Sequence, residues 1–169
     1  DALVAMVPLA KAPAWSVAVV EASRKAIMTD AAWNGGNYDA PPEKGIRLMR
    51  DILNLLSART PDMYSAQFTN GMDALPWMEV QETAMLKAMD ANDWIYQTWA
   101  YERHDVGATP GFNGDTAKAL ASIRAKTLIM TGTKDLLNPE FEPVAAARNI
   151  ADVKMMTISP GTVTGHASA

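Results

Sequence analysis

Apolar residues recur at helical spacing through most of the first hundred positions. The clearest case is EKGIRLMRDILNLLS (43–57), whose apolar positions lie on one face of an amphipathic helix. Helices are also predicted over 13–30 and over 79–105, the second with an interruption at 90–93. The stretch 33–45 is rich in glycine and proline and predicts a break between helices. This part of the chain is therefore expected to be almost entirely helical.

The last third of the chain has a different pattern, in which helices alternate with short, continuous apolar runs. The runs 125–132 and 153–160 predict buried strands, and the segments 115–123 and 138–151 predict helices. A strand, a helix and a strand joined by short turns imply parallel strands with a right-handed crossover. The apolar run 1–10 predicts a further buried strand, so the fold class is α/β.

Composition narrows the functional classes. The chain has 169 residues, of which 49% are hydrophobic, a net charge of −4 and no cysteine. Basic residues are scattered singly, which argues against a nucleic-acid or membrane surface, and the lack of cysteine excludes disulfides and thiolate chemistry. Residues 1–10 carry Pro8 and no basic residue, so they do not resemble a signal peptide, and the compartment stays open.

Two side chains with catalytic chemistry follow two of the predicted strands. Asp135 comes after the strand 125–132, and His166 comes after the strand 153–160. Ligands of open parallel sheets bind beyond the carboxyl ends of the strands, so both side chains are expected at one edge of the sheet. Each also has a simpler interpretation, because Asp135 could only cap a helix and His166 could be a structural loop residue.

A carboxylate bonded to one nitrogen of an imidazole prepares the other nitrogen to take a proton from a serine. In α/β-hydrolases the chain order is serine, then acid, then histidine, and Asp135 and His166 follow this order. The sequence therefore favours two members of a catalytic triad. No GxSxG occurs, and no serine of the chain lies between a predicted strand and helix. The nucleophile is expected on a missing N-terminal segment or a separate chain.

Four stretches covering nearly the whole chain resemble the homoserine O-acetyltransferase family, a branch of the α/β-hydrolase fold. The most specific features are WNGGNY, DANDW and an acid paired with a later Gly-His. The stretches are AIMTDAAWNGGNYDAPPEKGIRLMRDI (26–52), MDANDWIYQTWAYERHDVG (89–107), AKTLIMTGTKDLLNPEFEPVAAARNI (125–150) and ISPGTVTGHASA (158–169).

The resemblance implies the C-terminal portion of an α/β-hydrolase fold with an inserted helical lid. Residues 1–11 would be a core strand, 12–106 the lid and 107–169 the part of the core that carries the triad acid and base. Arg50 matches an arginine implicated in holding a substrate carboxylate, with a solvated helix arginine as the alternative. Tyr96 is assigned to substrate binding as part of a lid-walled tunnel, with packing inside the lid as the alternative.

The resemblance is incomplete beside both triad candidates. Where the family has a GHDAF-like motif at the histidine, this chain has GHASA. Where the family has an aromatic-rich segment after the acid, this chain has DLLNP. We therefore favour a serine-dependent ester or amide hydrolase over an O-acyltransferase of the homoserine O-acetyltransferase type. A non-catalytic helical interaction module and a catalytically dead homologue are the remaining alternatives.

No cofactor is implied for hydrolysis, whereas a transferase would use acetyl-CoA as acyl donor. The cluster of His104 with Glu102 and Asp105 is not expected to bind a metal, because adjacent helix residues point in different directions. The expected partners are the polypeptide that carries the serine and a small-molecule acyl substrate. A homodimer is an open alternative to a monomer.

Overall fold

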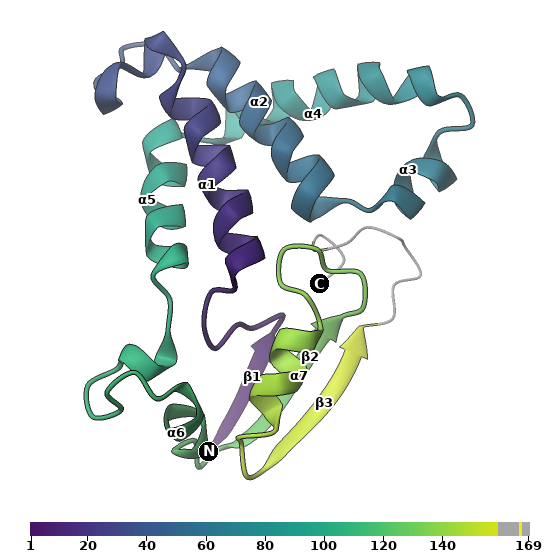
Figure 1. Ribbon diagram of the computed structural model, residues 1–169. Coiled ribbons are helices and arrows are strands. Elements are labelled where there is room, and N and C mark those ends of the chain that lie inside the picture. The colour runs from purple at the N-terminus through teal and green to yellow at the C-terminus, as the bar shows by residue number, and fades with distance from the viewer. Residues whose placement is uncertain (159–165, 167–169) are drawn as a thin grey trace.

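The computed structural model describes residues 1–158 and His166, and its sheet has three parallel strands. The strands are β1 (Ala2–Met6), β2 (Lys126–Gly132) and β3 (Val153–Ile158), with β2 in the centre (Figure 1). Ala5 lies opposite Ile129, which lies opposite Met155. The predicted parallel crossover is confirmed, and the carboxyl ends of all three strands share one edge of the sheet.

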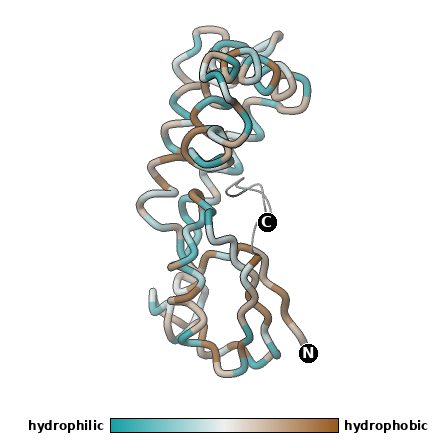
Figure 2. The backbone as a smooth tube through the Cα atoms, turned by 90° about the vertical axis from the view of Figure 1, so that its right-hand side faces the viewer, coloured by the Kyte–Doolittle hydropathy of each residue, from teal (hydrophilic) through white to brown (hydrophobic). Residues whose placement is uncertain are grey.

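The helices between residues 14 and 102 form a helical unit above that edge, as Figure 1 and the perpendicular view in Figure 2 both show. Its helices are α1 (Ala14–Met28), η1 (Ala31–Gly36), α2 (Glu43–Leu53), η2 (Asn54–Ala58), α3 (Pro61–Gln67), η3 (Gly71–Asp73), α4 (Ala74–Ala88) and α5 (Ala91–Glu102). The sheet unit contains η4 (Val106–Ala108), α6 (Thr116–Ala121) and α7 (Phe141–Ala147). Among the described residues, no helix is long and apolar enough to cross a bilayer.

Each unit has its own apolar core. Ile27, Ile46, Met49 and Ile95 are fully buried among α1, α2 and α5, which join the helical unit into one packed body. The second core lies between the sheet and its helices and contains Leu120, Ile129, Ala147 and Ile150. The division at residues 11 and 106 that the resemblance implies stays a prediction, because two cores do not by themselves define two domains.

The entry to and the exit from the helical unit run side by side. Lys11 and Asp105 form an isolated antiparallel bridge, and their side chains form an ion pair at 2.9 Å. The backbone N–H of Ala12 donates to the carbonyl of His104 at 2.9 Å, and Val106 donates to Ala10 at the same distance. This neck brings the two ends of the unit together, so the unit is an insertion between β1 and β2.

Most predicted elements are confirmed, with two informative differences. The helix predicted over 138–151 is shorter and spans only Phe141–Ala147, because residues 135–138 form a turn around the Asp135 carboxylate. The segment 79–105 is two helices that meet at the predicted interruption. The first ends at Ala88, and Asp90 caps the second, since its carboxylate accepts from the N–H groups of Asn92 and Asp93.

The motifs WNGGNY and DANDW are two halves of one hydrogen-bond network. Asn92 accepts from the indole N–H of Trp33 at 3.1 Å and donates to the carbonyl of Gly36 at 3.0 Å. The Tyr38 hydroxyl donates to Asp90 at 2.8 Å. Gly36 has a φ of +92°, and a Cβ there would lie 3.2 Å from the Asn92 oxygen. The glycines therefore allow a tight turn that fixes the start of α5.

One face of the sheet is apolar and uncovered by the described chain. Val4, Met6 and Met156 lie on the face opposite α7 and are 60%, 55% and 48% exposed. The colouring of Figure 2 shows that the strands contain many hydrophobic residues. Parallel sheets are normally covered on both faces and have strongly apolar strands for that reason. This face therefore has the composition of a buried surface.

Replacing Asn92 by alanine should destabilise the helical unit. The change leaves the indole N–H of Trp33 and the carbonyl of Gly36 without their partner, and unsatisfied groups of this kind cost about 1–3 kcal/mol. Urea denaturation followed by tryptophan fluorescence would measure the loss. Asn149→Ala is the matched control, because the Asn149 amide bonds only to the exposed Ala145 carbonyl at 3.3 Å. Equal stabilities of the two variants would contradict the network's role.

Acid should weaken the packing of η1 on α2 through Asp30. The N–H of Gly45, at 2.9 Å, and then that of Ala32, at 3.0 Å, lower the pKa of the Asp30 carboxyl. A lowered pKa means that the contribution to stability is present above the unfolded value of about 3.9 and is lost as pH falls through the folded pKa. Asp30→Asn should therefore flatten the dependence of stability on pH below about 4. Urea unfolding at a series of pH values would measure this dependence. If the unfolding free energy of Asp30→Asn changes with pH as steeply as that of the natural protein, the assignment is wrong.

Candidate active site

Asp135 lies in the turn that follows β2 and is almost completely buried, with 4% of its surface exposed. Its Oδ1 atom accepts from the backbone N–H of Leu137 at 2.9 Å and from that of Asn138 at 2.8 Å. An aspartate that bonds to the backbone two and three residues later closes a local turn. The Asp-Leu-Leu-Asn sequence therefore folds around its own carboxylate and leaves the second oxygen free for another partner.

That second oxygen is bonded to His166. The distance from Asp135 Oδ2 to His166 Nδ1 is 2.7 Å, and the imidazole is partly exposed while the carboxylate is not. The carboxylate accepts, so Nδ1 carries the proton and Nε2 is the nitrogen that can take one. The two side chains that the sequence places 31 positions apart thus touch at the carboxyl edge of the sheet. This arrangement can orient an imidazole and stabilise its charged form.

The turn that carries Asp135 is also bonded to the helical unit. The indole N–H of Trp15 donates to the carbonyl of Leu136 at 2.6 Å, and the Ser16 hydroxyl donates to the carbonyl of Leu137. The Lys134 ammonium pairs with Asp62 of α3. Sequence reasoning missed these contacts, because no local pattern relates residues 15 and 16 to a turn 121 positions later.

Arg50 lies at the C-terminal end of α2 and bonds to the Gln81 side chain at 2.9 Å. Its buried Nε has no hydrogen-bond partner in the described part of the chain, and burial, followed by the charge of Arg59, lowers the pKa of the guanidinium. Among the described residues, Arg50 makes no hydrogen bond to Asp135 or His166. The predicted role in substrate binding stays a prediction, although the residue is not the fully solvated arginine of the alternative.

Tyr96 lies on α5, is 67% exposed, and packs edge-on against Trp99 with ring centroids 5.5 Å apart. It lines a hollow together with Trp33, Gly36 and Asn92. Neither Asp135 nor His166 lines this hollow. The predicted substrate contact of Tyr96 therefore has no support from its neighbours in the described chain, and it stays a prediction.

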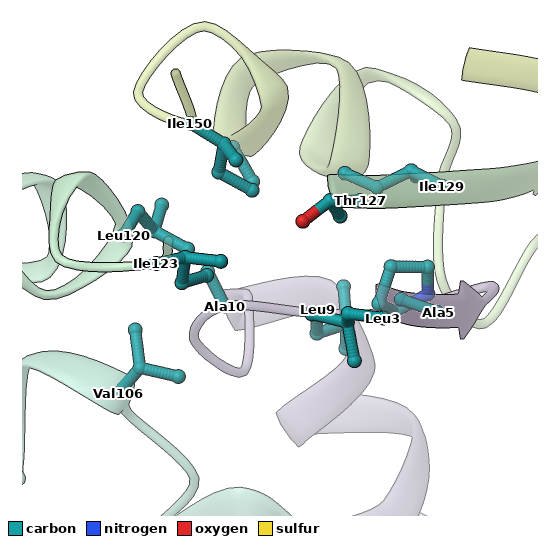
Figure 3. A pocket seen from close by; sticks show the side chains of 12 residues that line it. Leu3, Ala5, Leu9, Ala10, Val106, Leu120, Ile123, Thr127, Ile129 and Ile150 are labelled. Carbon is teal, nitrogen blue, oxygen red and sulfur yellow. The ribbon is translucent and has the colours of Figure 1, made fainter. Parts of the chain in front are cut away.

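An apolar pocket of about 130 Å³ lies beside the sheet and away from Asp135 (Figure 3). Leu3 and Ile129 come from strands, whereas Leu120 and Ile150 come from the segments that pack on this face. The pocket presents almost no polar groups, so it is suited to an apolar side chain rather than to acyl-transfer chemistry.

The polar cluster around His104 serves the neck between the two units. His104 Nε2 lies 2.9 Å from the carbonyl of Leu9. Asp105 accepts from the N–H of Gly107 at 2.8 Å and from the hydroxyl of Thr116 at 3.0 Å. Within the described part of the chain, no group of three or more histidine, aspartate or glutamate side chains is arranged to hold a metal ion.

The chain is similar in sequence to homoserine O-acetyltransferases. It is 29% identical to that of Nostoc punctiforme over 84% of this chain and 42% of the relative, and 30% identical to that of Chloroherpeton thalassium over 78% and 36%. It is 28% identical to the homoserine O-acetyltransferase of Rhodospirillum rubrum, over 96% of this chain and 46% of that relative. The chain thus spans less than half the length of these curated relatives. No family model matches it.

Solved structures give the same picture of the fold. The acetyl esterase MekB superposes with a TM-score of 0.84 at 22% identity, covering 98% of this chain and 48% of that one. The homoserine O-acetyltransferase of Bacillus anthracis gives a TM-score of 0.77 at 22% identity, with the same two coverages. This chain is the C-terminal portion of an α/β-hydrolase fold.

The predicted fold class is therefore confirmed, and so is the resemblance to homoserine O-acetyltransferases. Both groups of similar proteins are enzymes of the α/β-hydrolase fold, one named for acyl transfer and the other for ester hydrolysis. At these identities the solved structures establish the fold, and the chemistry has to be argued from the residues of this chain.

Proposed function

We propose that this chain supplies the acid and the base of a Ser-Asp-His triad for acyl chemistry. The hydrogen bond between Asp135 and His166, at the shared carboxyl edge of β2 and β3, is the observation that carries the proposal. Similarity to transferases and esterases of the α/β-hydrolase fold supports the same chemistry. The serine comes from polypeptide outside this sequence.

Each proton in the reaction passes through His166. The serine oxygen attacks the acyl carbon while His166 Nε2 takes the serine proton, and Asp135 stays ionised and stabilises the imidazolium. Nε2 then protonates the leaving group, which departs and leaves an acyl-serine. Water or an alcohol gives its proton to Nε2 as it attacks the ester. The same proton returns to the serine when the acyl group leaves.

The uncovered surface of the sheet supports a partner polypeptide that carries the serine. Among the described residues, β1 pairs only with β2, so its outer edge has free N–H and C=O groups. Next to that edge, Val4 and Met6 expose more than half of their surfaces. A further parallel strand on β1 would cover the edge, and helices behind it would cover the apolar face.

We favour hydrolysis over transfer, because the residues that follow both catalytic side chains differ from the transferase motifs. The high TM-score with an acetyl esterase is compatible with this choice. The similarity in sequence favours the alternative, a transferase that takes its acyl group from a donor such as acetyl-CoA. In either enzyme the buried Nε of Arg50, which has no partner among the described residues, would suit a carboxylate group of the substrate. The exposed Tyr96 would line the entrance to the tunnel that leads to the serine.

His166→Ala should lower the kcat for hydrolysis of p-nitrophenyl acetate by the complete protein by about a thousandfold or more, as expected for loss of a triad base. The matched control is His104→Ala, which removes the other histidine and should leave kcat within about twofold, because His104 lies in the neck between the units, where its ring bonds to the carbonyl of Leu9. Equal activities of His166→Ala and the natural protein would contradict the triad. Absence of hydrolysis by both proteins would favour a non-catalytic helical module.

Hydrolase and transferase are separated by adding homoserine to the same reaction, with acetyl-CoA tested as a second acyl donor. If the enzyme is a hydrolase, free acetate should appear at the same rate with and without homoserine. Mass spectrometry of the products would detect O-acetylhomoserine. Its formation faster than free acetate would overturn the choice of hydrolase and leave the triad intact.

A further inference from the structure

Asn138 joins three parts of the molecule that meet beside the candidate triad. It is the last residue of the turn that begins at Asp135, and its side chain is partly buried between β1 and α5. The resemblance to known enzymes assigns it no role, and it stands where the family has an aromatic-rich segment. Its side chain and its backbone N–H nevertheless bond to three different parts of the chain.

Both ends of the Asn138 amide are bonded, in different directions. Nδ2 donates to the carbonyl of Val7, just beyond β1, at 2.7 Å. Oδ1 accepts from the hydroxyl of Tyr101, on α5, at 2.7 Å. An asparagine is suited to this position because one side chain offers both a donor and an acceptor. An aliphatic residue of similar size could make neither bond.

The backbone of Asn138 reaches the catalytic candidate directly. Its N–H donates to Asp135 Oδ1 at 2.8 Å, while Oδ2 of the same carboxylate bonds to His166. Asp135 is fully buried, so the orientation of its carboxylate depends on these few donors. A displacement of Asn138 would therefore turn the carboxylate away from the imidazole.

Val7 supplies a further sign that this junction is held under constraint. Its φ is +41°, which is a rare conformation for a β-branched residue. The N–H of Val7 donates to the carbonyl of Met130 on β2 at 2.8 Å, and its carbonyl accepts from Asn138. Strained backbone persists where the surrounding structure over-determines it, and it gathers near functional sites.

We infer that Asn138 is a positioning residue of the proposed triad, which holds the Asp135 carboxylate in register with His166 by tying its turn to Val7 and to Tyr101. The expected effect on kcat rests on the proposed function, whereas the expected effect on the alignment of Asp135 with His166 does not. Through Tyr101, the same residue couples the orientation of the helical unit to the alignment of the acid and the base. The bonds of Trp15 and Ser16 to the adjacent carbonyls strengthen this coupling.

Replacing Asn138 by alanine in the complete protein tests the inference. We expect kcat to fall about 10- to 100-fold, as for misplaced catalytic groups, while KM changes less than twofold. The control is Asn149→Ala, which removes an asparagine side chain just after α7. In the described part of the chain this side chain bonds to the carbonyl of Ala145, so both constants should stay unchanged. Rates are normalised to the folded fraction from circular dichroism, so that a loss of folded protein is not counted as a loss of alignment.

A proton resonance gives a readout that needs no activity. A proton shared between a buried carboxylate and an imidazole resonates far downfield in NMR spectra, and His166→Ala identifies the signal by removing it. The signal should weaken or move upfield in Asn138→Ala and stay unchanged in Asn149→Ala. If the natural protein hydrolyses no ester, the proposed function fails, whereas the resonance still decides whether Asn138 holds the pair.

Tyr101→Phe tests the contribution of the helical unit to this coupling separately from the contribution of the Val7 bond beyond β1. It removes one of the two side-chain bonds of Asn138 and leaves the bond to Val7, so kcat should fall less than in Asn138→Ala, by about threefold, with the same direction of change in the resonance. A folded Asn138→Ala variant with natural kcat and an unchanged resonance would overturn the inference. So would equal changes in Asn138→Ala and Asn149→Ala.

Discussion

The Asp135 carboxylate is the point on which the site depends, because its two oxygens have different tasks. One oxygen closes the turn after β2 by accepting two backbone N–H groups, and the other accepts from His166. The carboxylate is buried, so these protein donors take the place of the water that would otherwise bond to its oxygens. The turn and the catalytic candidate are therefore one structure. Their stability and their chemistry cannot be changed independently.

The helical unit contributes to the site by holding this turn from above. Trp15 and Ser16 at the start of α1 and Tyr101 near the end of α5 bond to the turn, although all three lie in the inserted segment. The unit has its own core and is joined to the sheet unit through a narrow neck, so these bonds determine how it sits on the sheet edge. The helical unit is therefore also part of the scaffold of the proposed triad.

The sheet shows the opposite feature, a surface with nothing over it in the described chain. Its strands carry methionine, valine and leucine on the face away from α7, and β1 has one unpaired edge. Exposed apolar surface of this kind marks an interface. In the proposed enzyme one polypeptide would both supply the serine and cover the sheet, so the two requirements support each other.

The sequence alone determined the elements that depend on local pattern. The three strands, the parallel crossover and the break at 90–93 follow from apolar spacing and from short polar side chains. It also determined that Asp135 and His166 meet, because parallel strands bring their carboxyl ends to one edge whatever lies between them.

Only the tertiary structure decided the roles of Asn138 and Tyr101 and the surroundings of Arg50. Their partners are 31 to 131 positions away, and no period in the sequence relates a side chain to a carbonyl at that distance. The helix predicted from residue 138 begins only at Phe141. The N–H of Asn138 is bonded within the local turn to Asp135, and its side chain is bonded to the distant Val7 and Tyr101, so local and long-range bonds together hold the residue outside the helix.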